Sequence, residues 1–290
     1  MSVIEVQNLK KYFGKNKAVN DISFNIEKGE IFGFLGPNGA GKTTTIRCMM
    51  DFIRATDGHI KILGKDAHKE TDKLMRSIGY LSGIVHLYDK WTGQTHFNYM
   101  QKLNGDKNIA KELSDRLEFD PTVRTKKLSS GNRQKLGIIL SLMHQPEVLI
   151  YDEPTNALDP LLQNEVYKLL EEAQGRGATI FMSSHNLHEV ERVCSRVGII
   201  KKGRMVATES IESLREKRLY EVRVFFKNKV IQDQVIAPGI EIVKELDQGF
   251  VMTVKGDVNI LLDRLEPLDI DDLEISYGSL EDIFLEYYQH

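Results

Sequence analysis

The stretch GPNGAGKTT at residues 36–44 decides the fold that this sequence predicts. It matches the pattern G-x-x-x-x-G-K-[S/T], in which glycines let backbone N–H groups turn inward around phosphate oxygens. The preceding segment, EIFGFLG at 30–36, is apolar and aromatic, as a buried strand should be. The following segment, TTTIRCMMDFI at 43–53, repeats apolar residues at helical spacing. Strand, glycine loop and helix in this order predict a binding site for nucleotide phosphates.

Each side chain of the loop has an expected role. Lys42 can reach the β- and γ-phosphates, the Thr43 hydroxyl can bind Mg²⁺, and Thr44 can support the α-phosphate. The helix that begins here adds the partial positive charge of its N-terminus. The alternative is a chance glycine turn, which the flanking strand and helix disfavour. The nucleotide-binding residues expected in the loop are Gly36, Asn38, Gly39, Ala40, Gly41, Lys42, Thr43 and Thr44.

A pair of carboxylates follows a second apolar segment. VLIY at 148–151 predicts a buried strand that ends on Asp152 and Glu153. A carboxylate at a strand end beside a phosphate loop can hold Mg²⁺, so Asp152 joins Thr43 as a candidate metal ligand. A second carboxylate beside it can polarise the attacking water, which makes Glu153 the candidate general base. An Asp-Glu pair alone would more simply start a loop, but four apolar residues before it and Pro-Thr after it favour the catalytic interpretation.

Two more motifs carry small polar residues. LSSGN at 128–132 precedes a strongly apolar amphipathic helix, and small residues at a helix start can form a second anion site. ATIFMSSH at 178–185 predicts another buried strand with His185 at its end, where the ring can hydrogen-bond a γ-phosphate. A lone histidine is usually structural. Its position after this strand is what makes His185 a catalytic candidate together with Glu153 and Lys42.

In this order, the phosphate loop, LSSGN, LIYDEPTNALD and SSH resemble the ATP-binding cassette (ABC) family over roughly residues 3–208. The resemblance implies an α/β fold with a P-loop ABC-ATPase core, made of a mixed sheet with helices, an antiparallel β subdomain and an α-helical signature subdomain. It also implies the cofactors ATP and Mg²⁺. By the same resemblance, Ser129 and Gly131 contact the γ-phosphate of ATP bound to a second subunit, Asp159 lies at the dimer seam, and His185 is a switch histidine.

The position of Phe13 also follows from the resemblance, because the family stacks an aromatic ring on adenine there. Tyr12 is the neighbouring alternative, and a role for Phe13 as a strand-edge core residue is equally open. The chain departs from the usual family signature LSGGQ at Ser130 and Asn132, both tolerated changes. A larger departure is Gly83, which stands where the family places a glutamine that touches Mg²⁺ and senses the membrane partner. This departure therefore bears on metal coordination and on coupling to the membrane partner, and not on nucleotide binding.

The chain divides into two expected domains. Residues 1–215 form the nucleotide-binding domain, with antiparallel strands over about 1–30 and a helical subdomain at about 84–143. Residues 216–290 form a small C-terminal α/β domain, in which SLEDIFLEYYQ at 279–289 predicts a final helix. This second domain resembles the tail of ATP-binding subunits from bacterial ABC exporters. Its aromatic residues Phe284, Tyr287 and Tyr288 fit either a partner surface or a core stripe.

The composition of the chain limits the classes of function that it can have. The 290 residues carry a formal net charge of −3, which speaks against a nucleic-acid partner. No segment approaches the ~20 apolar residues of a membrane helix, and the two cysteines, Cys48 and Cys194, are expected in the core.

The sequence thus predicts the ATP-hydrolysing subunit of an ABC exporter at the cytoplasmic face of the cell membrane. It would work with an integral membrane permease and with a second copy of itself or a related ABC ATPase subunit. Peptides, antibiotics or toxins are the cargo that the tail suggests. The alternatives are a soluble ABC-type ATPase of DNA repair or the ribosome, and a scaffold that binds nucleotide without hydrolysis.

Overall fold

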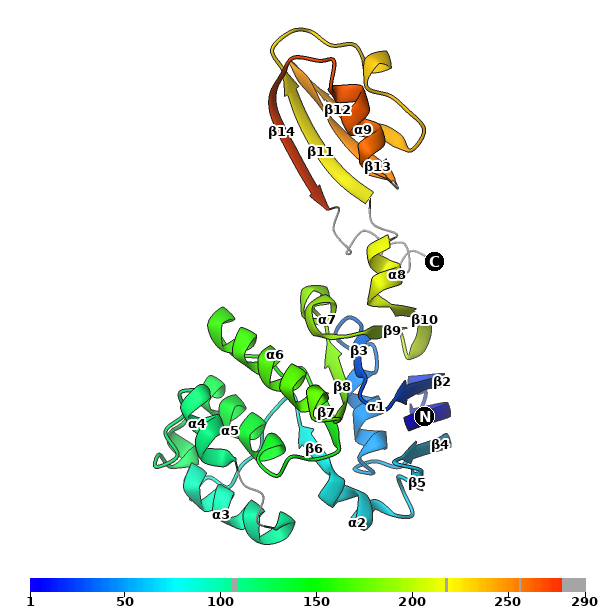
Figure 1. Ribbon diagram of the computed structural model, residues 1–290. Helices are drawn as coiled ribbons and strands as arrows, with labels where there is room; N and C mark the ends of the chain where they lie inside the picture. Colours follow the sequence, from blue (N-terminus) through cyan, green and yellow to red (C-terminus); the bar gives the residue numbers. More distant parts are fainter. Residues whose placement is uncertain (106–108, 217–218, 256, 278–290) are drawn as a thin grey trace. The chain divides into compact units, whose positions relative to one another are not determined.

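The computed structural model describes residues 1–105, 109–216, 219–255 and 257–277 (Figure 1). The chain divides into two compact units, Met1–Glu209 and Ser210–His290. The sequence placed the boundary at residue 215, and the observed division falls just before helix α8 (Ile211–Glu216). The helix and the aromatic residues expected at 279–290 lie outside the described residues.

The first unit is built on a six-stranded sheet in which β6, β7, β8, β3 and β9 run parallel. Strands β3, β7 and β8 are buried along their whole length, which explains why they read as continuous apolar runs. In order across the sheet, the strands are β10 (Arg204–Ser210), β9 (Arg196–Lys201), β3 (Ile31–Leu35), β8 (Thr179–Ser184), β7 (Val148–Asp152) and β6 (Ile78–Leu81).

The register of the parallel strands positions the candidate residues. Leu35 pairs with Ser184, and Asp152 pairs with Ser183. The phosphate loop follows Leu35, Glu153 follows Asp152, and His185 follows Ser184. Because parallel strands end at the same edge of a sheet, three segments that are far apart in sequence meet there.

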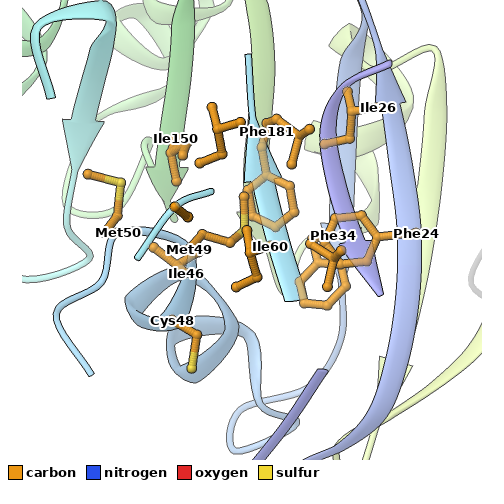
Figure 2. Packing of buried hydrophobic residues seen from close by; sticks show 14 of the residues in the cluster. Phe24, Ile26, Phe34, Ile46, Cys48, Met49, Met50, Ile60, Ile150 and Phe181 are labelled. Atoms are coloured by element: carbon orange, nitrogen blue, oxygen red, sulfur yellow. The ribbon is translucent and has the colours of Figure 1, made fainter. Parts of the chain in front are cut away.

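An antiparallel sheet, as the first 30 residues predict, packs beside the parallel one. Its strands, in the order β2-β1-β4-β5, are β2 (Asn16–Glu27), β1 (Ser2–Phe13), β4 (Asp57–Ile62) and β5 (Lys65–Asp66). Helix α1 (Lys42–Met49) contributes Ile46 and Met49 to the core that both sheets share (Figure 2). Phe24 of β2 stacks on Phe32 of β3 with ring centroids 5.6 Å apart. Cys48 and Cys194 are free and buried, as expected.

Helices occupy most of the predicted helical subdomain, on the side of the sheet that ends in β6 (Figure 1). Residues 84–92 are an exception, because the first helix begins only at Gly93, where the Thr92 hydroxyl accepts the Thr95 N–H. The elements are α3 (Gly93–Asn104), α4 (Ala110–Arg116), the 3₁₀ turn η2 (Thr125–Lys127) and α5 (Ser130–Leu142).

The remaining helices of this unit are α2 (Thr71–Leu74), the 3₁₀ turn η1 (Met75–Ser77), α6 (Pro160–Gly175) and α7 (Leu187–Val193). Arg116 of α4 binds two carboxylates of α6, with 2.6 Å from Nε to Glu165 and 2.7 and 2.8 Å from its two terminal nitrogens to Glu172. These bonds fix the helical subdomain to the sheet domain. Within the described parts of the chain, no helix is long and apolar enough to cross a membrane.

The second unit contains a four-stranded antiparallel sheet in the order β12-β13-β11-β14, with α9 packed on one face (Figure 1). Its order along the chain resembles the β-α-β-β-α-β motif, with one 3₁₀ turn in place of the first helix. The α/β character predicted for this region is confirmed. The elements are β11 (Leu219–Phe226), η3 (Gln232–Gln234), β12 (Ile240–Leu246), β13 (Gly249–Lys255), α9 (Asn259–Leu265) and β14 (Ile270–Tyr277).

His144, just after α5, is a buried titratable side chain in the first unit. Neither ring nitrogen makes a hydrogen bond of good geometry among the residues described, and interactions with the backbone of Ile78 and Leu140 only partly offset its burial. Burial lowers the pKa of His144, and burial also lowers the pKa of His96 in α3. In the unfolded chain both rings regain a pKa of about 6.5. The unfolded state therefore takes up protons first as the pH falls, and stability declines below that value.

We expect the free energy of unfolding to decrease between about pH 7.5 and pH 5.5, because protons bind preferentially to the unfolded chain. The variant His144→Leu should show a shallower decrease, since one of the two groups no longer titrates. Urea unfolding of both proteins across this pH range measures the slopes. Equal slopes would contradict the assignment to His144.

Candidate active site

The phosphate loop connects β3 to α1 and requires glycine at two points. A Cβ atom at Gly36 would lie 2.4 Å from the carbonyl oxygen of Ile200. A Cβ atom at Gly41 would lie 2.5 Å from the carbonyl oxygen of Ala18, and Gly41 has a φ of 113°. Both contacts are too close for any side chain, and the positive φ disfavours other residues at Gly41. The loop therefore keeps its shape only with glycine at these two positions.

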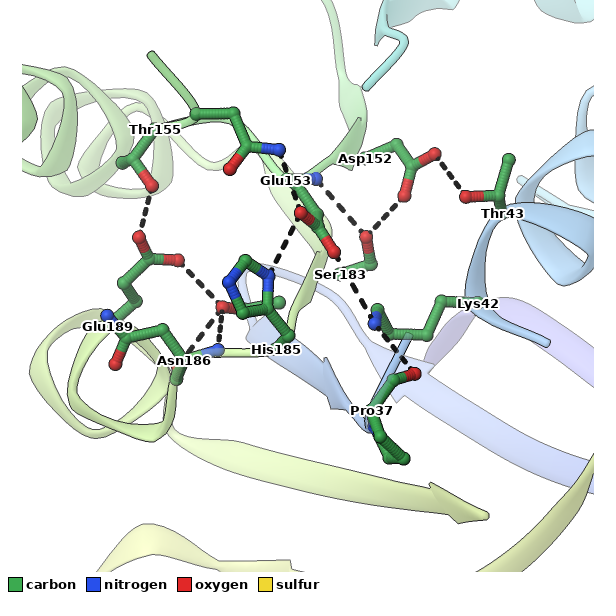
Figure 3. Close-up of polar contacts among 12 residues, drawn as sticks. Pro37, Lys42, Thr43, Asp152, Glu153, Thr155, Ser183, His185, Asn186 and Glu189 are labelled. Carbon is green, nitrogen blue, oxygen red and sulfur yellow. Dashed lines mark hydrogen bonds and ion pairs between the residues drawn. The ribbon is translucent and has the colours of Figure 1, made fainter. Parts of the chain in front are cut away.

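Lys42 is the first residue of α1, and its side chain is only 5% exposed. Its ammonium group donates to the carbonyl oxygens of Gly36 and Pro37, at 2.6 and 3.3 Å. It also lies 3.4 Å from Oε1 of Glu153 (Figure 3). The lysine charge is thus satisfied by neutral carbonyls and one carboxylate, partners that phosphate oxygens could replace.

Asp152 connects the phosphate loop with the end of β8. The Thr43 hydroxyl donates to Oδ2 of Asp152 at 2.7 Å, and the Ser183 hydroxyl donates to Oδ1 at 2.6 Å (Figure 3). These oxygen atoms are the hard donors that Mg²⁺ prefers. No group of three or more His, Cys, Asp or Glu side chains suited to a metal occurs among the described residues. A divalent ion would therefore need phosphate and water as its other ligands.

Glu153 occupies the centre of the polar cluster. Its Oε2 accepts a hydrogen bond from the Asn156 side-chain amide at 2.7 Å and lies 3.0 Å from Nδ1 of His185 (Figure 3). Burial pushes the pKa of Glu153 upward. The hydrogen bonds from Asn156 and His185 and the charges of His185 and Lys42 outweigh burial, so the net pKa lies below the ordinary value for glutamate. Glu153 is therefore an ionised carboxylate at neutral pH, as a proton acceptor must be.

A second buried carboxylate supports the same edge of the sheet. Glu189 of α7 accepts hydrogen bonds from the hydroxyl groups of Thr155 and Ser184, the latter at 2.7 Å (Figure 3). The Ser184 hydroxyl also accepts the backbone N–H of Asn186 at 2.8 Å. This network joins the turn after Glu153 to the strand end before His185, which keeps the two candidate catalytic residues close together.

A cleft of about 530 Å³ opens over the phosphate loop. Phe13 lines this cleft and is 51% exposed, which disfavours a core role and favours the role of an adenine platform. The Tyr12 hydroxyl instead lies 3.0 Å from the side-chain amide of Asn20. The other lining residues are Asn16, Lys17, Ala18, Asn38, Gly39, Gly41, Lys42, Thr43, Thr44, Glu153, Lys202 and Gly203.

The residues of the signature segment, 128–132, do not line the cleft over the phosphate loop. The Ser129 side chain caps the start of α5 by accepting the Asn132 N–H at 3.3 Å, and a Cβ at Gly131 would lie 2.8 Å from the carbonyl of Ala157. Asp159 caps α6. Neither Ser129 nor Gly131 lines the cleft over the phosphate loop of its own chain.

The departure at Gly83 leaves open space beside the candidate metal residues. A Cβ at Gly83 would lie 3.3 Å from Oδ2 of Asp152. The adjoining pocket, of about 610 Å³, is lined by Thr43, Asp152, Glu153 and Asn156 on one side and by residues 80–87 on the other. A side chain at position 83 would point at Asp152, and this chain supplies none there.

Sequence reasoning missed three residues of the site: Asn156, Ser183 and Gln134. Asn156 follows Glu153 by three positions, a turn spacing that could have suggested a contact. Ser183 stands beside Asp152 only because of the strand register. Gln134 donates to the Pro154 carbonyl across a long sequence separation, which no local pattern indicates.

The comparisons with known proteins agree with this geometry. A family model described as ABC transporter matches residues 19–156. The bacitracin transport ATP-binding protein BcrA of Bacillus licheniformis is 36% identical over 237 residues, which cover 79% of this chain and 78% of BcrA. An uncharacterized ABC transporter ATP-binding protein of Methanocaldococcus jannaschii is 35% identical over 98% of both chains. The linearmycin resistance ATP-binding protein LnrL of Bacillus subtilis is 36% identical over 71% of this chain and 68% of LnrL.

Solved structures have the same fold. The structure of an ATP-binding subunit of an ABC transporter superposes with a TM-score of 0.68 at 28% identity, covering 74% of this chain and 92% of that one. A dimeric ATP-binding cassette in a post-hydrolysis state, bound to ADP and Pi, superposes with a TM-score of 0.65 at 21% identity. It covers 72% of this chain and 98% of that one, and at this identity it shows the fold alone.

The network around Glu189 allows a stability test. We expect Thr155→Val to lower the free energy of unfolding by about 1–3 kcal/mol, because a buried carboxylate loses one of its donors. Thr122→Val is the matched control, since the Thr122 hydroxyl donates to Asp120 at an exposed position. That change should lower stability by less than about 1 kcal/mol. Urea unfolding at pH 7 measures both, and equal losses would show that the Glu189 network adds nothing.

Proposed function

The chain belongs to the family of ABC transporter ATP-binding proteins and is an ATPase, and we propose that it powers export through a separate integral membrane permease. The observation that carries the catalytic part of this proposal is the contact of Glu153 with Lys42, beside the hydrogen-bonded pair Thr43–Asp152. These groups supply a phosphate ligand, a proton acceptor and hard oxygen donors at one edge of the sheet.

Binding of ATP would rearrange the contacts of Lys42. The β- and γ-phosphate oxygens are stronger acceptors than the carbonyls of Gly36 and Pro37, so Lys42 would turn to them and release Glu153. The backbone of the loop and the N-terminus of α1 favour the same negative charge. The adenine ring would stack on Phe13, which lines the cleft beside Asn38 and Gly39.

Glu153, once released, would orient a water molecule for in-line attack on the γ-phosphorus. The water oxygen forms a bond to phosphorus, and the bond between the γ-phosphorus and the bridging oxygen breaks, so that ADP leaves with the electron pair. Glu153 accepts the proton of the water. His185, which contacts Glu153 at 3.0 Å, would hold the γ-phosphate from the other side. In the nucleotide-free site the low pKa of Glu153 keeps its carboxylate ionised, and its basicity would rise once Lys42 turns to the phosphates.

Thr43 and Asp152 fit the role of Mg²⁺ ligands, because their oxygens lie side by side. When bound there, the ion would neutralise charge that develops on the phosphates. Ser183 would hold the second oxygen of Asp152 in place. Gly83 offers no side-chain ligand, so Thr43 and Asp152 are the two ligands that we propose from the described residues.

A second cassette would complete the site. Ser129 and Gly131 do not line the cleft of their own chain, which fits the role of contacting ATP held by the partner cassette. The partner would be another copy of this chain or a related cassette. Glu153 and His185 are both present, so a homodimer would have two complete sites.

The proposals for the exported cargo and for the location of this subunit rest on the relatives and not on residues of this chain. BcrA is named for bacitracin transport and LnrL for linearmycin resistance. We therefore propose an antibiotic, peptide or toxin as the exported class, with this subunit at the cytoplasmic face of the cell membrane. The relatives favour this reading over the soluble alternative in DNA repair or on the ribosome, and no nucleic acid is needed as a partner.

The role of Glu153 has a direct kinetic test. We expect Glu153→Gln to lower kcat for ATP hydrolysis by about 10²–10⁴-fold, because the amide cannot accept the proton of the attacking water. The affinity for ATP should remain within a few-fold of the unmodified protein. Glu171→Gln, at an exposed position of α6, is the control and should leave kcat unchanged. Turnover of Glu153→Gln equal to that of the control would exclude Glu153 as the general base.

The transporter partner has a biochemical test. We expect this chain, isolated from its native membranes in mild detergent, to carry a stoichiometric protein with several membrane helices, because its relatives are ATP-binding proteins of transporters. Mass spectrometry identifies that protein. Recovery with ribosomes, DNA or soluble proteins alone would contradict the permease and favour the soluble alternative.

A further inference from the structure

Gln134 is a buried polar side chain in α5 that lies next to the candidate general base. It is 4% exposed, and its side-chain amide donates to the carbonyl oxygen of Pro154 at 2.8 Å. The same nitrogen lies 3.5 Å from the carbonyl oxygen of Glu153. The Gln134 amide therefore connects helix α5 to the backbone segment that carries Glu153, the candidate general base.

The backbone at Glu153 needs such support. Glu153 has a φ of 50°, a left-handed conformation that is unfavourable for a residue with a side chain and persists only when its surroundings hold it. From the sheet side, the Glu153 N–H donates to the carbonyl and the hydroxyl of Ser183, both at 3.2 Å. From the helix side, Gln134 holds the next peptide group. The turn is thus fixed between β8 and α5.

A second contact joins the same two segments. A Cβ at Gly131 would lie 2.8 Å from the carbonyl of Ala157, so the first turn of α5 packs closely against the turn that follows Glu153. Ala157 also has a positive φ, of 61°. The start of α5, which carries Ser129, and the 153–157 turn therefore form one packed unit.

We propose that Gln134 is a positioning residue for ATP hydrolysis, which holds the Glu153 carboxylate in its working place through the Pro154 carbonyl. This inference rests on the proposed role of Glu153 as general base. Gln134 does not touch the nucleotide cleft. Its loss should therefore lower kcat and leave the affinity for ATP unchanged.

The test compares two glutamines whose side-chain amides each donate to a backbone carbonyl at 2.8 Å, Gln134 at a buried position and Gln174 at an exposed one. Gln134→Met keeps the length of the side chain but removes the donor. We expect it to lower kcat by about tenfold, the effect of one buried hydrogen bond, with the KM and Kd for ATP within twofold. Gln174→Met is the matched control, because Gln174 donates to the Gly29 carbonyl outside the site. It should leave kcat unchanged.

A double-mutant cycle separates positioning from general loss of structure. If Gln134 acts through Glu153, adding Gln134→Met to Glu153→Gln should not lower the residual single-turnover rate further. An equal tenfold loss in both backgrounds would overturn the inference. A kcat within twofold of the unmodified protein in Gln134→Met, with collapse in Glu153→Gln, would also overturn it and leave the proposed function intact. Full turnover in Glu153→Gln would instead overturn the proposed function and this inference with it.

A second variant covers the case in which Gln134→Met does not fold. Gln134→Glu keeps the shape, and its carboxyl group can donate to the Pro154 carbonyl only when protonated. We expect its kcat, relative to that of the unmodified protein, to rise as the pH falls from about 8 to about 6, since burial raises the pKa of a carboxyl group. A ratio that is constant over this range, in a variant that still binds ATP, would contradict a role for the amide donor.

Discussion

The parallel register of β3, β8 and β7 is the constraint on which the rest of this structure depends. Leu35 pairs with Ser184 and Asp152 pairs with Ser183, so the three strands end at one edge. The phosphate loop, the candidate general base and the candidate switch histidine each follow one of these strand ends. A shift of one residue would separate the Thr43 hydroxyl from Asp152, which now lie 2.7 Å apart. The core beneath the edge, with Phe24 stacked on Phe32, holds the register in place.

The charges at this edge balance each other when no phosphate is near. Lys42 pairs with Glu153, and Glu153 in turn contacts His185 and Asn156. When phosphates draw Lys42 away, the Glu153 carboxylate loses its ion pair but keeps the hydrogen bond from the Asn156 amide. The same residues thus provide both the stability of the nucleotide-free site and its capacity to respond to a bound triphosphate.

Much of this could be predicted from the sequence, because the phosphate loop and the acidic strand are contiguous motifs within regular elements. The mixed sheet, the antiparallel strands and the small second domain followed from periodicity and from the family resemblance. Gln134 could not be predicted, because its contact depends on the positive φ of Glu153 and on packing between distant segments. The non-helical segment 84–92 was also missed, since composition marks the ends of helices poorly.

The most direct test of the account is a crystal structure of Glu153→Gln bound to ATP and Mg²⁺. We expect Lys42 to contact the β- and γ-phosphates and to leave residue 153, the ion to lie against Thr43 and Asp152, and Ser129 of a second copy to approach the γ-phosphate. Nucleotide bound away from the 36–44 loop, or a Lys42 side chain that still contacts residue 153 and the loop carbonyls, would contradict the account.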